Sequence, residues 1–145
     1  MNSQEVAQHK GKTMTEDEVN DFEKIQTQLD SLHSEISILS KKSQNDALNK
    51  FKMKFVNQAI AKANTMLGEK YKPFPDFIQF EDDDLPTNSD VTMILGQYLN
   101  CLEKLRADNI SREQEYDGNR YFYEWYWRVD GKKSKIKTKA PEKIG

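Results

Sequence analysis

The chain has 145 residues, of which 36% are hydrophobic and 32% are charged, and its formal net charge is −2. This length provides one modest hydrophobic core and excludes two independent ones. No stretch approaches the ~20 apolar residues of a membrane-spanning helix, which excludes that class of membrane protein.

The charge is distributed unevenly along the chain. From Gly118 onward, eight Lys or Arg residues stand against three Asp or Glu residues. This part therefore carries about +5 and the remainder about −7. Such a division predicts a basic contact surface on an otherwise acidic body.

Residues 1–14 are polar and lack the apolar run of roughly 7–15 residues that marks a secretory signal. We expect this segment to be disordered. The one cysteine, Cys101, excludes an intramolecular disulfide and fits a reducing compartment. It falls within an apolar helical pattern, so we expect a buried thiol. The sequence thus predicts a cytoplasmic protein that makes no contact with a membrane.

A first helix is predicted over residues 15–41. Thr15 and Glu18 have the capping-box spacing, in which each side chain binds an unpaired amide of the first helical turn. Apolar residues then recur at heptad spacing, namely Phe22, Ile25, Leu29, Leu32, Ile36 and Leu39. One helix cannot bury its own stripe, so this seam needs either a second copy of the chain or the next helix. We favour a homodimer through residues 19–39.

Residues 45–109 are expected to form a helical core. Its first helix is predicted from about Asn45 to Leu67, with Ser43 as the N-cap and Gly68 ending it in the left-handed conformation. Four lysines on this helix are interpreted as its solvated face, namely Lys50, Lys52, Lys54 and Lys62.

The segment from Tyr71 to Pro86 combines prolines, aromatic residues and acids. This composition predicts an irregular connection whose aromatic rings anchor it to the core. Thr87 and Asp90 then repeat the capping-box spacing, and the apolar periodicity that follows predicts a helix running to about Asn109.

Asp130–Gly131 lies between two strand-like runs and predicts a β-hairpin, because a type I′ turn needs positive φ at both central residues. A two-residue loop sets the register. The expected pairs are Val129 with Lys132, Arg128 with Lys133, Tyr126 with Lys135, Glu124 with Lys137 and Phe122 with Lys139. Side chains alternate between faces. The face expected to join the core carries Tyr123, Trp125, Trp127, Val129 and Ile136.

Residues 110–116 either extend the preceding helix or form another strand. A strand is favoured because Asp117–Gly118 follows, and this dipeptide is a second signal for a tight turn. In that turn, Glu115 would pair with Arg120 on the next strand. The predicted fold class is α+β, with about three helices, the first long and heptad-patterned, and a C-terminal antiparallel hairpin or three-stranded meander over 110–139. Residues 15–145 should form a single domain that ends in a tail at 140–145.

Linear motifs of catalysis and cofactor binding are missing, so we expect neither an enzyme nor a cofactor or metal site. The two histidines are His9 and His33, and neither has a neighbouring cysteine or histidine that could complete a metal site. The acidic run Glu81–Asp84 lacks the spacing and glycine of a calcium loop and is interpreted as a solvated loop.

The second face of the hairpin is the candidate binding surface. Lysines can neutralise phosphates while aromatic rings stack on exposed bases, as in single-strand binders. The residues assigned to nucleic-acid binding are Phe122, Tyr126, Arg128, Lys133, Lys135, Lys137 and Lys139. The same lysines also suit a solubilising edge strand or cation–π contacts within the hairpin. We expect a small non-catalytic intracellular binding or accessory protein.

The alternative is a protein-interaction module, such as a regulator, inhibitor or assembly factor of a larger machine. Such a module would contact its partner through the heptad helix and the acidic surface. Its motivation is the seam of residues 22–39, which has to be covered by something.

Overall fold

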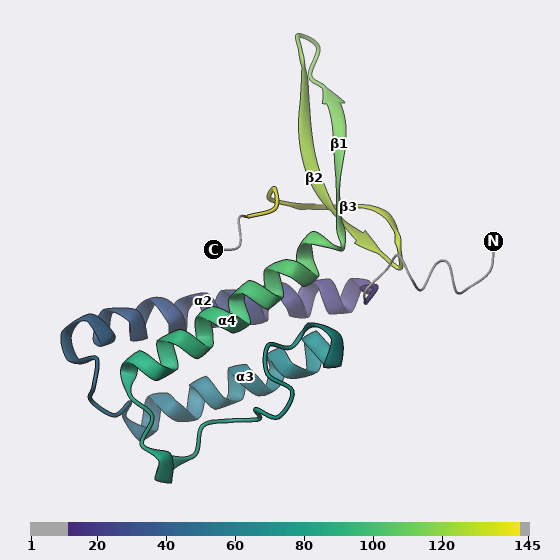
Figure 1. Ribbon diagram of the computed structural model, residues 1–145. Coiled ribbons are helices and arrows are strands. Elements are labelled where there is room, and N and C mark those ends of the chain that lie inside the picture. The colour runs from purple at the N-terminus through teal and green to yellow at the C-terminus, as the bar shows by residue number, and fades with distance from the viewer. Residues whose placement is uncertain (1–11, 143–145) are drawn as a thin grey trace. The chain divides into compact units, whose positions relative to one another are not determined.

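The computed structural model describes residues 12–142 (Figure 1). Its elements in chain order are α2 (Glu16–Ser43), α3 (Lys50–Tyr71), a 3-10 helix (Asp82–Asp84), α4 (Asn88–Ala107), β1 (Ile110–Tyr116), β2 (Tyr121–Val129) and β3 (Lys132–Thr138). Three helices therefore precede a three-stranded antiparallel sheet of order β1-β2-β3, which confirms the predicted α+β class and the strand at 110–116. His9 lies outside the described residues.

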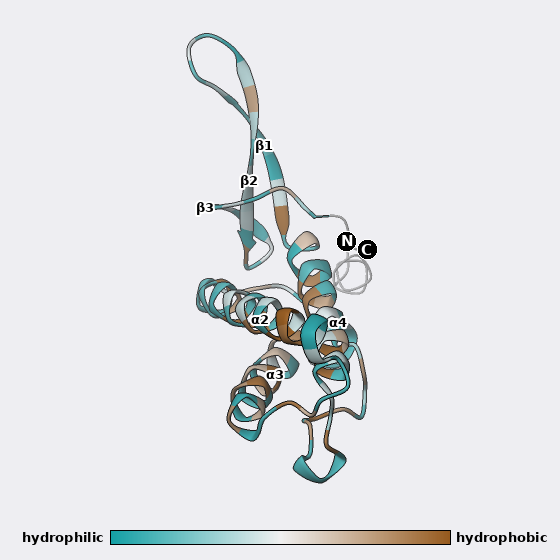
Figure 2. Ribbon diagram, turned by 90° about the vertical axis from the view of Figure 1, so that its left-hand side faces the viewer, coloured by the Kyte–Doolittle hydropathy of each residue, from teal (hydrophilic) through white to brown (hydrophobic). Residues whose placement is uncertain are grey.

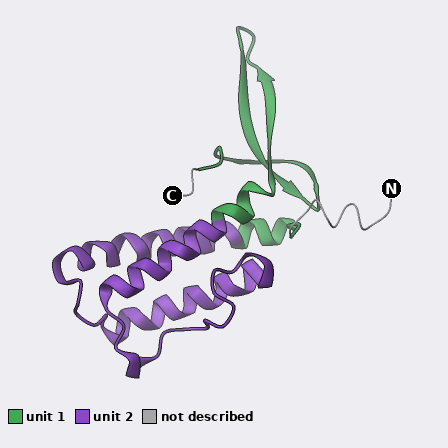
Figure 3. Cartoon of the chain, viewed as in Figure 1, with its two compact units in different colours: residues 1–21, 103–145 green, residues 22–102 purple. Residues whose placement is uncertain are grey.

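The chain forms two compact units (Figure 3). One unit comprises residues 22–102 and holds most of α2, all of α3 and most of α4. The other joins the N-terminal residues up to 21 with residues 103–145, including the sheet. The single domain expected over 15–145 stays a prediction. No helix among residues 12–142 is long and apolar enough to cross a membrane.

Both predicted capping boxes are present. The amide of Glu18 donates to Thr15 Oγ1 and the amide of Thr15 donates to Glu18 Oε1, each at 3.1 Å. The amide of Asp90 donates to Thr87 Oγ1 at 3.1 Å, and the amide of Thr87 returns a bond to Asp90 Oδ2 at 3.2 Å. These reciprocal bonds satisfy two orphan amides each and place the starts of α2 and α4 where local sequence predicts them.

The start of α3 differs from the prediction. The helix begins at Lys50 rather than near residue 45, and its N-cap is Asn49, whose Oδ1 accepts from the Lys52 amide at 2.8 Å. The reason is tertiary, because residues 44–48 pair with the segment before and at the start of α4. Their backbone bonds are Leu48 N to Pro86 O, Asn88 N to Asp46 O and Ser89 N to Gln44 O.

Gly68 interrupts α3 with the predicted positive φ of 65°, but its ψ of −173° is not that of the predicted left-handed conformation, and the helix does not end there. Few residues other than glycine adopt this combination. The helical backbone resumes after the kink and ends at Tyr71, so α3 extends one turn beyond the predicted end at Leu67.

The heptad seam of α2 is covered within the helical unit. Four of its members are 0–7% exposed, namely Phe22, Ile25, Leu29 and Ile36. Leu32 and Leu39 are half-buried. The buried residues of the other two helices include Val56, Ala59, Ile60 and Ala63 on α3 and Val91, Leu95, Tyr98 and Leu102 on α4. Intramolecular packing therefore satisfies the seam, which removes the reason for a homodimer through residues 19–39.

Two asparagines of α3 hold the connection that precedes α4. Asn57 Nδ2 donates to the Phe80 carbonyl and the Phe80 amide donates to Asn57 Oδ1, both at 2.9 Å. Asn64 Nδ2 donates to Phe77 O at 3.3 Å, and its Oδ1 accepts from the Tyr98 hydroxyl at 2.7 Å. The rings of Phe74, Phe77, Phe80 and Tyr98 pack against one another. The expectation that aromatic residues anchor this connection is confirmed.

In the other unit, Trp127 and Met14 are fully buried. The Asp130 amide donates to the Met14 carbonyl at 2.7 Å, and the Arg128 amide donates to the Asn109 carbonyl at 2.6 Å. Met14 was expected within the disordered N-terminus, and the structure instead makes it part of the core. Burial of the Met14 side chain removes an apolar group from water and, with the backbone bond to Asp130, fixes this residue in place. The rest of that segment, residues 1–11, lies outside the described residues.

Candidate functional site

The β2–β3 turn has the predicted form. Asp130 has φ 53° and Gly131 has φ 76°, the two positive values of a type I′ turn. The first two cross-strand pairs are Val129 with Lys132 and Arg128 with Lys133, as predicted.

Beyond these pairs, the predicted register is wrong by two residues. Tyr126 pairs with Lys137 rather than Lys135, and Trp125 pairs with Thr138. The cause is a bulge in β3. The Ser134 hydroxyl donates to the Trp127 carbonyl at 2.6 Å and accepts from the Ile136 amide at 3.1 Å, so a side chain replaces part of the backbone ladder.

The shift also displaces the pairs expected for Glu124 with Lys137 and for Phe122 with Lys139. Because the shift is an even number of residues, the strand keeps its faces. Tyr126 and Lys137 therefore lie on the same face of the sheet.

The β1–β2 connection is a four-residue loop, Asp117 to Arg120, instead of the predicted two-residue turn. Asp117 Oδ1 accepts from the amides of Asn119 (2.9 Å) and Arg120 (3.0 Å), and these bonds lower the pKa of the Asp117 carboxyl. This side chain stabilises the longer loop. Glu115 consequently pairs with Phe122, not with Arg120.

Cross-strand pairing assembles one face from all three strands, which we name the mixed-charge face. Its members are Ser111, Glu113 and Glu115 on β1, Phe122, Glu124, Tyr126 and Arg128 on β2, and Lys133 and Lys137 on β3. This face contains most of the residues predicted to bind nucleic acid. β1 adds two carboxylates to it that the sequence analysis did not place there.

The carboxylates on β1 form a hydrogen bond and an ion pair with two of the residues predicted to bind nucleic acid, Tyr126 and Lys133. Tyr126 is only 8% exposed, and its hydroxyl donates to Glu115 Oε1 at 2.7 Å. The bond to Glu115, burial, and the negative charges of Glu115, Glu124 and Glu113 raise the pKa of Tyr126 to about 12. A buried ring whose hydroxyl is bound to Glu115 cannot stack on a base, so the role predicted for Tyr126 is not supported by its surroundings.

The predicted cations fall into two groups. Lys133 Nζ lies 2.9 Å from Glu113 Oε1, Arg128 Nη2 donates to the Gly131 carbonyl at 2.7 Å, and Lys139 pairs with Glu142. Lys135 and Lys137 are exposed and form no ion pair within residues 12–142. Phe122 is half-buried. Free positive charge is therefore concentrated on β3, which is an edge strand without Asp or Glu.

The opposite face of the β1–β2 hairpin carries exposed rings, and we name its outer part the tyrosine face. It consists of Arg112, Gln114, Tyr116, Tyr121 and Tyr123. The three tyrosines are 58%, 67% and 56% exposed in that order. The Tyr116 and Tyr121 rings lie 4.9 Å apart between centroids, and the Arg112 guanidinium lies 4.1 Å from the centre of the Tyr123 ring. The Arg112 guanidinium thus lies over one face of the Tyr123 ring, and the Tyr116 and Tyr121 rings contact each other.

The exposure of Tyr123 contradicts its predicted place in the core. Trp127 on the same face is fully buried and Trp125 is half-buried, but burial ends there. β3 pairs only with residues 125–129 of the nine-residue β2, so the first half of β2 pairs with β1 alone. The alternation pattern identifies the face on which Tyr123 lies but not how far along the strand that face is covered.

Charge divides between the two faces of the hairpin. All three carboxylates of β1 and β2 lie on the mixed-charge face, and no Asp or Glu occupies a strand position of the tyrosine face. The signal that could have found this surface is the alternation of Arg112, Gln114 and Tyr116 along β1. The sequence allowed residues 110–116 to be either helix or strand. No side chain of this segment was therefore assigned to a face of the sheet, and the tyrosine face was not predicted.

Other candidate chemistry stays weak. No group of three His, Cys, Asp or Glu side chains that could hold a metal ion occurs in the part of the chain that the structure describes. The acidic run forms an exposed 3-10 turn, which is the hydrophilic turn at the bottom of Figure 2. Cys101 is half-buried, whereas a fully buried thiol was predicted. The reason is that Cys101 lies beside the apolar stripe of α4 and not on it.

Comparison of the chain with known protein families, with curated proteins and with solved structures gave no match.

Proposed function

We propose that this protein is a small, non-catalytic, cytoplasmic accessory protein that binds single-stranded nucleic acid through its C-terminal sheet. The observation that supports this proposal is the tyrosine face. It combines three exposed rings and a guanidinium on one acid-free hairpin surface.

Stacking is the contact that these residues suit best. Bases of a single strand expose their π-faces, and each base stacked on an aromatic side chain contributes about 1–3 kcal/mol to binding. Tyr121 and Tyr123 are one strand repeat apart, about 7 Å, which is a spacing that successive unstacked bases can span. Arg112 offers a planar cation beside the Tyr123 ring that can pack on a base or contact a phosphate.

The exposed lysines of the edge strand β3 supply an electrostatic contribution to the proposed contact, and Lys137 does so from the face opposite the tyrosine face. Lys135 and Lys137 carry positive charge on a strand that contains no acid. Lysine contacts to phosphates release counterions, so they strengthen binding in a salt-dependent and sequence-independent way. A protein with these two contributions should prefer single strands to duplexes and show little preference among sequences.

Equilibrium binding of fluorescent oligothymidine and oligouridine strands of about 20 nucleotides, compared with a duplex of equal length, tests the proposal. The Tyr121→Ala/Tyr123→Ala double variant should bind about 10-fold more weakly or worse, because two stacking platforms are lost. Phe51→Ala, which removes an equally exposed ring from the helical unit, is the matched control and should bind like the wild type. Single-strand binding that is absent at low salt, or unchanged in the double variant, would refute the proposal.

The contribution of β3 is measured separately by salt dependence. Lys135→Gln/Lys137→Gln should reduce the slope of log Kd against log salt concentration by about 1.4, since each lost phosphate contact contributes about 0.7 on single strands. Lys41→Gln/Lys42→Gln, at the exposed end of α2, removes the same charge elsewhere and should leave the slope unchanged.

A further inference from the structure

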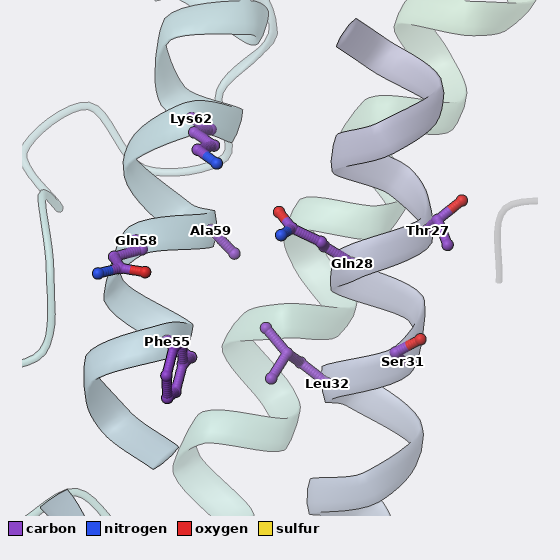
Figure 4. Close-up of a pocket in the computed structure, with 8 residues that line it drawn as sticks. All are labelled: Thr27, Gln28, Ser31, Leu32, Phe55, Gln58, Ala59 and Lys62. Carbon is purple, nitrogen blue, oxygen red and sulfur yellow. The ribbon is translucent and has the colours of Figure 1, made fainter. Parts of the chain in front are cut away.

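The helical unit carries a groove between α2 and α3 with a volume of about 330 Å³. It is lined by Thr27, Gln28, Ser31 and Leu32 of α2 and by Phe55, Gln58, Ala59 and Lys62 of α3. Figure 4 shows Gln28 and Leu32 directed toward the side of α3 that carries Ala59 and Phe55. The Gln28 amide therefore points between the two helices beside Leu32, Ala59 and Phe55, whereas the Gln58 amide lies on the side of α3 away from α2.

An exposed aromatic pair extends this apolar surface. Phe51 and Phe55 lie one helical turn apart on α3, and their rings meet edge to face with centroids 5.0 Å apart. Phe51 is 71% exposed and Phe55 is 42% exposed. Solvated helix faces normally carry polar residues at such positions, and aromatic rings are enriched where proteins meet partners.

The groove lies in a positive environment. No Asp or Glu lines it, whereas Lys62 does. α3 contains five lysines and one glutamate, and of the lysines only Lys52 bonds to α2, with 2.6 Å between its Nζ and Glu35 Oε1. An occupant would thus meet apolar surface at the centre and positive charge at the rim.

We infer that the α2–α3 groove binds an acidic amphipathic helix of a partner protein. Bulky apolar residues at positions i, i+3 or i+4, and i+7 of that helix would pack on Phe51, Phe55 and Leu32, as in other helix-in-groove complexes. Its carboxylates would pair with Lys62 at the rim. This site lies in the helical unit and is independent of the nucleic-acid surface proposed for the sheet.

A second copy of the chain fits this groove less well than an acidic partner. A two-fold contact places the same groove of both copies together, and the residues that line it include no Asp or Glu that could pair with Lys62 of the other copy.

Selection from a displayed library of random peptides of about 16 residues, long enough for four helical turns, tests the inference on the full chain. Enriched peptides should combine Asp or Glu with apolar residues at helical spacing. The tightest of them should bind Phe55→Asp about 10-fold more weakly and Lys62→Glu several-fold more weakly than the wild type. Lys70→Glu, an equal charge change at the far end of α3, is the matched control and should bind like the wild type.

Four outcomes would overturn the inference. One is the absence of enriched peptides, and another is enrichment of basic or uncharged sequences. The third is equal binding of the selected peptide to the wild type and to both groove variants. Both substitutions are at exposed positions, and circular dichroism checks that the variants are folded. The fourth is a dimer in sedimentation that Phe55→Asp dissociates, because a second copy would then occupy the groove. The oligonucleotide assay with Tyr121→Ala/Tyr123→Ala reports on the sheet alone and separates the two proposals.

Discussion

Arg106 and Glu103, one turn apart on α4, form a bidentate ion pair inside the unit that contains the sheet. Arg106 Nε and Nη2 donate to Glu103 Oε1 and Oε2 at 2.8 Å each, and the side chains are 2% and 6% exposed. The same guanidinium donates to the carbonyls of Lys139 (2.7 Å) and Ala140 (2.9 Å), and Glu103 Oε2 accepts from the Glu142 amide at 2.8 Å. One buried pair therefore holds the segment predicted to be a tail.

Replacement of Arg106 should destabilise the protein severely. Arg106→Met leaves the Glu103 carboxylate buried without its partner, and breaking a buried pair in this way costs about 3–5 kcal/mol. Urea denaturation followed by circular dichroism measures the free energy of unfolding. The double variant Arg106→Met/Glu103→Leu should recover a large part of the loss, since it removes the isolated charge. Lys104→Met, on the exposed face of α4, is the control, and a loss as small as in this control would contradict the prediction.

Asn57 should matter more than other half-buried polar residues of α3. Asn57→Ala removes both bonds to the Phe80 backbone and leaves a carbonyl and an amide to find other partners, at a cost of about 2 kcal/mol. Hydrogen exchange should show faster exchange at the Phe80 amide than in the wild type. Gln58→Ala, one position away and exposed, should change neither stability nor exchange at this site. If the Phe80 amide of Asn57→Ala is as well protected from hydrogen exchange as in the wild type, the two bonds between Asn57 and Phe80 do not stabilise this connection.

Two glycines should respond to alanine in opposite directions. A Cβ at Gly96 of α4 would lie 3.7 Å from His33 Nε2, an ordinary contact distance, and alanine stabilises a helix interior by about 0.5–1 kcal/mol. At Gly68, with φ 65° and ψ −173°, alanine should destabilise by about 1–3 kcal/mol because of backbone strain. Midpoints of urea unfolding measure both changes. A destabilised Gly96→Ala would mean that His33 cannot accept the added methyl group.

Local signals predicted the parts of the fold that depend on neighbouring residues. The capping boxes at Thr15 and Thr87 and the Asp130–Gly131 turn need only side chains within three positions, and all three are present. The start of α3 at Asn49 is different, because residues 44–48 pair with residues some forty positions away. Periodicity alone cannot reveal such long-range pairing.

The candidate site was predictable only in part for the same reason. The turn sets the first two cross-strand pairs of β3. The bulge at Ser134 arises because the Ser134 side chain bonds to the Trp127 carbonyl in place of a backbone hydrogen bond between the strands. The alternation of polar and apolar residues does not predict this bulge. The faces were assigned correctly, while their burial was not. Tyr126 is covered and Tyr123 is exposed, because coverage depends on how far β1 and β3 extend along β2.

Tyr126 should make stability depend on pH at the alkaline end. The bond to Glu115, burial and neighbouring carboxylates raise its pKa from 10 to about 12, so the folded state retains the phenolic proton longer than the unfolded chain. The resulting stabilisation is fully present below pH 10 and is lost as the pH rises to about 12. The free energy of unfolding should therefore fall over this interval, and should fall less in Tyr126→Phe.

Titration of the ring carbons of labelled tyrosine by NMR isolates this group from the other tyrosines. The Tyr126 signal should titrate near pH 12, and in Glu115→Gln its midpoint should move down toward 10, because the substitution removes the negative charge and replaces a carboxylate acceptor with a weaker amide oxygen. Gln114→Glu adds a carboxylate to the opposite face of β1 and serves as the control for a general charge effect. If Glu115→Gln leaves the midpoint in place, the bond to Glu115 is not the cause of the raised pKa of Tyr126.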